Sequence, residues 1–225
     1  MLTVLCSIAA LIATWLSLAV DQVLRGLTGA LVGIRFRGLE MDASRYFTVR
    51  ALQGPPPQLG AWSWTFVLLS GSAAILVLAL LLFGLVSALR SPGWLRGLSL
   101  AWLVVALLWI PGALVAAAAP GGGGPFAELY GKLGDPQAGR WTAALLSALA
   151  LVLAAGMASR QAVAVGRSWM RADAAEFRRR LVRVTAGWPG AASLVALGAL
   201  AGWASSAWLL LVPALVVLTF HLRTR

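Results

Sequence analysis

The chain has 225 residues, of which 60% are hydrophobic and only 11% are charged. A soluble domain carries roughly a quarter charged residues, so this composition excludes an ordinary cytosolic enzyme and a disordered protein and indicates an integral membrane protein. The net charge of +11 comes almost entirely from arginine. Arginine at membrane edges snorkels to headgroups, and without a soluble basic domain we expect no nucleic-acid partner.

The first apolar segment, residues 2–20, is close to the roughly 20 residues that a helix needs to cross a bilayer. It has no basic region before it and no clear cleavage site after it, so we expect a retained transmembrane helix rather than a signal peptide. Residues 34–37 alternate apolar and basic side chains, and residues 46–50 are rich in strand formers. These two segments predict a short β-hairpin, at about residues 34–52.

Three further spans follow, and tryptophans stand where an interfacial belt belongs, at Trp62 and Trp64 just before the second one. The sequence predicts spans at residues 64–89, 95–118 and 141–159. Pro111 predicts a kink or an early end of the third span. We expect a flexible break at residues 120–125 and then a short polar excursion at residues 126–136.

Residues 160–187 contain seven arginines, and apolar residues recur among them at spacings of three and four. This pattern predicts one amphipathic basic helix that lies on lipid headgroups or packs on a partner. The basic residues expected to face lipid or a partner are Arg171, Arg178, Arg179, Arg180 and Arg183.

The final apolar run, residues 189–222, is long for one span and short for two. The chain is therefore expected to be an all-α polytopic membrane protein with five spans, or six as the alternative, and a hairpin after the first. Within the last run, Gly198, Gly202 and Ser206 repeat every four residues, a spacing typical of close helix packing. The expected organisation is a membrane core at residues 1–159, a basic connector at residues 160–187 and the C-terminal span or spans at residues 188–225.

The segment from Asp21 to Ile34 resembles the first core helix of the site-2-protease-like zinc metalloproteases. In that family the helix carries His-Glu-x-x-His, then a glycine with an aliphatic residue, then short strands. Here Gly33 and Ile34 match, and a strand pattern follows. The zinc chemistry does not match, because Asp21 and Arg25 stand at the two histidine positions and Gln22 stands at the general base.

Two later segments also resemble this family. Residues 53–57 supply a proline-rich approach, and residues 70–75 place Gly71 among small residues, as at the start of the family's second core helix. The segment 135–141 resembles the motif with the third zinc ligand if Gln137 replaces its aspartate, and a shift of two residues would put Asp135 there instead. The resemblance covers about residues 10–152 and implies a protease-like membrane core without its metal ligands.

Arginine cannot ligate a metal, because its guanidinium stays protonated and has no free lone pair. Asp21 and Arg25 are four residues apart, so on a helix they face each other. We expect an ion pair, joined by Gln22, at a helix end near the membrane interface. The alternative is that Asp21 carries protons or binds a cation.

The leading functional hypothesis is a non-catalytic scaffold or accessory subunit that packs against other integral membrane proteins in a hetero-oligomeric complex, with lipids as its other contacts. We expect no metal and no cofactor, and a location in a bacterial cytoplasmic membrane. One alternative is a membrane hydrolase with atypical site residues drawn from Asp21, Gln22, Asp135 and hydroxyl side chains. Another is a pigment- or haem-binding subunit of a photosynthetic or respiratory complex that uses His221.

Overall fold

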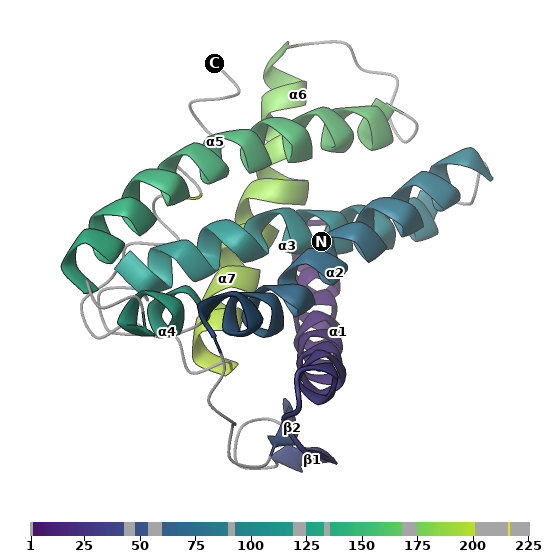
Figure 1. The fold of residues 1–225 in the computed structure, drawn as a ribbon. Helices are drawn as coiled ribbons and strands as arrows, with labels where there is room; N and C mark the ends of the chain where they lie inside the picture. The colour runs from purple at the N-terminus through teal and green to yellow at the C-terminus, as the bar shows by residue number, and fades with distance from the viewer. Residues whose placement is uncertain are drawn as a thin grey trace.

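The computed structural model describes residues 2–42, 48–53, 60–89, 93–118, 125–132, 136–167, 175–200 and 216. Its elements are α1 (Leu2–Leu31), β1 (Phe36–Asp42), β2 (Thr48–Gln53), α2 (Ala61–Ala88), α3 (Gly93–Ala118), α4 (Pro125–Lys132), α5 (Pro136–Arg167), α6 (Ala175–Val182), a π-helical turn η2 (Arg183–Gly187) and α7 (Trp188–Leu200). The chain is thus a helical membrane protein with one hairpin, as expected (Figure 1).

Four of the described helices, α1, α2, α3 and α5, are long and apolar enough to cross a membrane. They correspond to the first four predicted spans. Most of the predicted fifth span lies outside the described residues, so the choice between five and six spans stays a prediction.

Helix α3 is the central element of the bundle. In its most apolar stretch 83% of the residues are buried, against 33% in α1, 33% in α2 and 39% in α5. Helices α1, α2, α5 and α7 all pack against α3, and the other three spanning helices have apolar faces that no other described element covers. These faces suit contact with lipid tails or with another membrane protein.

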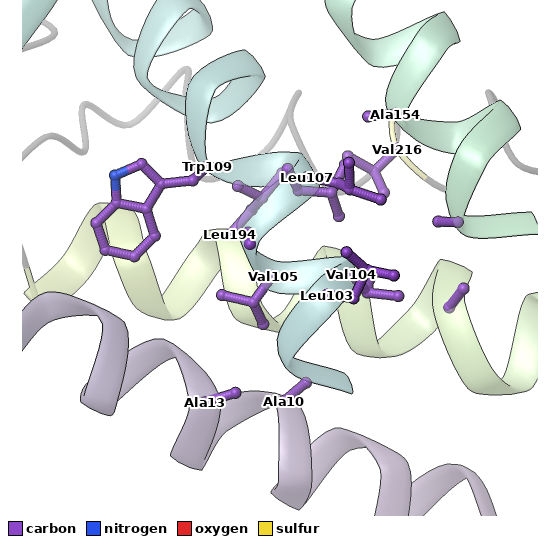
Figure 2. Close-up of a cluster of buried hydrophobic side chains, with 14 of the residues drawn as sticks. Ala10, Ala13, Leu103, Val104, Val105, Leu107, Trp109, Ala154, Leu194 and Val216 are labelled. Atoms are coloured by element: carbon purple, nitrogen blue, oxygen red, sulfur yellow. The ribbon is translucent and has the colours of Figure 1, made fainter. Parts of the chain in front are cut away.

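The core beside α3 is built mostly from small and branched side chains, together with the fully buried Trp109, as Figure 2 shows. Ala10 and Ala13 of α1 lie toward Val105 of α3, and both alanines are at most 5% exposed. Leu194 of α7 joins the same cluster. Small residues at such contacts let helix backbones approach closely where no hydrophobic effect drives association.

Of the two outcomes predicted at Pro111, a kink or an early end, the early end does not occur, because α3 continues to Ala118 as the predicted span does. Proline removes one backbone hydrogen bond, but transmembrane helices tolerate this where neighbours support the helix. The residues that follow Pro111 are tightly packed, because Ala113 and Ala116 are fully buried. This packing holds the last turns of α3 in place.

Within the predicted polar excursion at residues 126–136, residues 125–132 form a short helix, α4, which the sequence pattern does not predict. Proline is favoured at the first helical position, where Pro125 stands. Phe126 packs against the core of the bundle, and Tyr130 packs on Gly139 of α5. Tertiary packing therefore stabilises the helix α4, although this segment is too short to show a periodic pattern in the sequence. The predicted break at residues 120–125 lies outside the described residues, except for Pro125, where α4 begins.

The prediction of one amphipathic helix over residues 160–187 is wrong. Helix α5 continues to Arg167, and α6 starts at Ala175 and runs in a different direction (Figure 1). Residues 183–187 then form the π-helical turn, where the Trp188 amide donates to the Arg183 carbonyl. The turn ends at Gly187, two residues before Pro189, which has no N–H to donate, so the wider spacing accommodates the proline and α7 continues.

The predicted hairpin is confirmed, with β1 and β2 antiparallel and Glu40 opposite Arg50. The chain enters it from α1 through Gly33, which has a positive φ of 90°. The Gly33 amide donates to the Ala30 carbonyl at 3.2 Å and the Ile34 amide to the Gly29 carbonyl at 2.9 Å. This is the Schellman pattern that ends a helix at a glycine, and the hairpin that follows it packs against α1.

Candidate functional site

Asp21 and Arg25 form an ion pair one helical turn apart on α1. Arg25 Nε lies 2.8 Å from Asp21 Oδ2. The Arg25 side chain is 16% exposed and the Asp21 side chain is 2% exposed. Among the described residues, Nε and Nη2 of Arg25 have no aligned hydrogen-bond acceptor. The pair therefore rests mainly on charge attraction, which is strong where water is excluded. The predicted ion pair is confirmed.

The pair does not lie at a helix end, and that part of the prediction is wrong. Helix α1 continues for ten residues beyond Asp21, to Leu31, and the whole segment 4–31 qualifies as one membrane-crossing span. The polar residues after position 20 do not end the helix, because α2 and the hairpin cover them. Asp21 is thus a buried charge within a spanning helix.

Gln22 connects the ion pair to the hairpin. Its Nε2 donates to Asp21 Oδ2 at 3.4 Å, and its Oε1 accepts the Ala51 amide at 3.2 Å. One turn further along α1, Gln53 Nε2 donates to the Arg25 carbonyl at 3.0 Å. Strand β2 therefore lies along α1 and gives the polar residues of this helix protein partners instead of water.

Helix α2 closes the other side of the pair. Gly71 lies directly against the Asp21 carboxylate, and a β-carbon at Gly71 would come within 3.0 Å of the Asp21 Cα. Next to this contact, the hydroxyls of Thr28 and Ser70 are hydrogen-bonded at 3.0 Å. Helices α1 and α2 thus meet through polar groups at the depth of the ion pair, and only glycine fits at position 71.

Some buried polar atoms of this cluster have no partner within the described part of the chain. They include Asp21 Oδ1 and the hydroxyl of Ser17, which lies one turn before Asp21 on α1. Asp21 Oδ2 is already occupied by Arg25 and Gln22. Asp21 Oδ1 is therefore a buried carboxylate oxygen that faces Gly71 of α2.

The structure does not bring Gln137 to the ion pair. Gln137 lies at the start of α5, in a groove with Ala118, Arg140, Trp141 and Ala144, and no residue of α1 lines this groove. The other candidate for the third ligand, Asp135, lies outside the described residues. Within the described ranges, no three His, Cys, Asp or Glu side chains come together.

The remaining candidates are spread over the C-terminal half. Gly198 lies in α7, while Gly202, Ser206 and His221 lie outside the described residues, as does Arg171. Arg178, Arg179 and Arg180 lie in α6, where Arg179 and Arg180 are exposed. Arg183 lies in the π-helical turn, and its Nε donates to the Arg179 carbonyl at 3.4 Å.

Sequence reasoning missed the contacts that bury the pair. In the sequence, Ser70 and Gly71 stand out only as small residues of a span, and Gln53 only as the start of a proline-rich segment. The face of α1 that carries Thr14, Ser17, Asp21 and Thr28 at steps of three, four and seven was a usable signal. A polar stripe of this kind within a span requires partners on neighbouring elements.

Comparison with protein-family models, with curated proteins and with solved structures finds no match to this chain. The fold and the site therefore define its class by themselves. It is an integral membrane protein of helical type, with four described helices able to cross a bilayer and a buried ion pair within α1 where this helix packs against α2.

Proposed function

We propose that this protein is a non-catalytic scaffold or accessory subunit that packs against other integral membrane proteins in a larger complex. We place it in the cytoplasmic membrane of a bacterium. We also propose that its core is a degenerate site-2-protease-like fold in which the metal ligands have been replaced.

The observation that carries the proposal is the Asp21–Arg25 contact of 2.8 Å at the positions where that family holds zinc. A guanidinium cannot ligate a cation and repels one. The Asp21 carboxylate is confined between Arg25, Gln22 and Gly71, which leaves it no open side for a catalytic water. This arrangement supports a structural role for residues that would otherwise carry chemistry.

The second half of α2 is the surface that we propose for the partner. Leu81, Gly84, Leu85 and Ala88 are all exposed there, and no side chain of the described residues lies within 4 Å of the position of a Gly84 β-carbon. Gly84 and Ala88 are four residues apart, the spacing that lets a second helix approach closely in a membrane. A face made only for lipid has no need of small residues at this spacing.

The test is to isolate the complex from its own membranes with chains carrying Gly84→Ile or, as a matched control, Ala148→Ile. Ala148 is an exposed small residue on the apolar face of α5. We expect Gly84→Ile to release the partner while the isolated chain unfolds at an unchanged temperature, and Ala148→Ile to release nothing. Equal retention of the partner in both variants would contradict the proposed surface, and one zinc per chain would contradict the non-catalytic role.

A further inference from the structure

A groove of about 230 Å³ opens between the end of α3 and the start of α5. Ala118 is the last residue of α3, and Gln137 is the first residue of the α5 span. The groove therefore lies at an edge of the membrane, where lipid headgroups are found. Two of the residues that line it, Ala118 and Ala144, have small side chains, which leave the space open.

One positive charge faces this groove. Arg140 is exposed, and none of the described carboxylates lies within ion-pair distance of it. The first turn of α5 contains no acidic residue. Asp135 lies outside the described residues. A phosphate group is the anion present in highest amount at this depth, and guanidinium binds phosphate with paired, charge-assisted hydrogen bonds.

The groove continues into an exposed apolar stripe on α5. Trp141 lines the groove and is 73% exposed, and Leu145, Leu149 and Leu153 follow at steps of four with 74%, 59% and 59% of their surface exposed. Tryptophan is favoured at headgroup depth, since its ring is apolar and its N–H is polar. A molecule with a charged head and an apolar chain fits a groove that carries an arginine and continues into an apolar stripe.

The start of α5 is held in place independently of any ligand. Gly139 is buried on the side of α5 that faces α4, and a β-carbon there would lie 2.5 Å from the Tyr130 ring. Burial raises the pKa of the Tyr130 phenol, so this contact stays uncharged at neutral pH. The groove is therefore preformed by packing between α3, α4 and α5.

We propose that this groove binds the headgroup of an anionic phospholipid. Arg140 pairs with the phosphate, Gln137 and Trp141 line the headgroup, and an acyl chain follows the leucine stripe of α5. An anionic lipid is favoured over a zwitterionic one because none of the described lining residues is a carboxylate that could receive a positive headgroup.

The test measures lipid retained by the delipidated full-length chain in detergent, by native mass spectrometry during titration with phosphatidylglycerol or phosphatidylcholine. Arg140→Gln is compared with Arg160→Gln, which removes an exposed arginine about 30 Å further along the same helix. We expect one phosphatidylglycerol to bind in preference to phosphatidylcholine. Arg140→Gln should weaken phosphatidylglycerol binding about tenfold because a charge-assisted contact is lost, and Arg160→Gln should weaken it less than twofold.

A second variant, Ala144→Phe, keeps the charge and fills the groove, and it should weaken the lipid to a similar extent. Thermal unfolding of each variant shows that the fold is retained. Equal loss in Arg140→Gln and Arg160→Gln, or equal binding of the two lipids, would overturn the proposal. Displacement of the lipid by millimolar inorganic phosphate would also overturn it, because the site would then take a free anion and not a lipid.

Discussion

The Asp21 carboxylate lies against Gly71 so closely that no larger residue fits between α1 and α2 at this point. The same carboxylate pairs with Arg25 on its own helix. One side chain therefore sets both the spacing of two spanning helices and the charge balance within the membrane. The stability of the bundle should depend strongly on this small cluster.

Gly71→Ala is expected to destabilise the protein by roughly 1–3 kcal/mol, the usual cost of overpacking a tight contact. The added methyl would meet the carboxylate and lie 3.0 Å from the Cα of Asp21, so relief requires movement of the α1 backbone. Equilibrium unfolding of the isolated chain in mixed detergent micelles measures the change.

Gly84→Ala on the same helix is the matched control, because no atom in the described part of the chain lies within 4 Å of its β-carbon position. It should leave the isolated chain unchanged or more stable, since alanine is the better helix former by about 1 kcal/mol. Equal destabilisation by the two substitutions would show that the contact at Gly71 has no special role.

Arg25→Gln is expected to cost about 3–5 kcal/mol, because it leaves the Asp21 carboxylate buried without a counter-charge. Asp21→Asn combined with Arg25→Gln should recover most of this loss, since no charge then remains in the cluster. A double-mutant cycle of unfolding free energies measures the coupling.

Arg180→Gln on α6 removes an exposed arginine and provides the comparison for this cycle. It should change stability by no more than about 0.5 kcal/mol. If the double variant were as unstable as Arg25→Gln alone, the ion pair would not be the reason for the loss.

Gln22→Met is expected to loosen the attachment of the hairpin. It removes the acceptor for the Ala51 amide, a hydrogen bond of 3.2 Å. Because such a bond contributes about 1 kcal/mol, hydrogen exchange at this amide should become several-fold faster. Gln53→Met, which removes only the bond to the Arg25 carbonyl, should affect the Ala51 amide less. An identical change in both variants would contradict a specific role for Gln22.

The long elements of this fold could be predicted from the sequence because hydropathy and strand patterns extend over many residues. The four spanning helices, the hairpin and the spacing of Asp21 and Arg25 all follow from such local patterns. The sequence did not predict α4 or the separation of α5 from α6. Each of these depends on tertiary packing, such as that of Tyr130 on Gly139, which overrides the local signal.

The sequence is sufficient to predict which residues form the ion pair, but not which residues surround it. A spacing of four residues on one helix is sufficient to predict that Asp21 and Arg25 pair. That Gly71 and the hairpin bury the pair follows from how α1, α2 and β2 cross. Local sequence does not encode such crossings, so the pair was wrongly expected at a helix end.

The most direct test of the proposed role is native mass spectrometry of the protein extracted in detergent from its own membranes. Its mass reports bound proteins and bound metal together. We expect the chain in a complex of fixed stoichiometry with another integral membrane protein, with no mass added by zinc. A chain that appears by itself and carries one zinc ion would contradict the account.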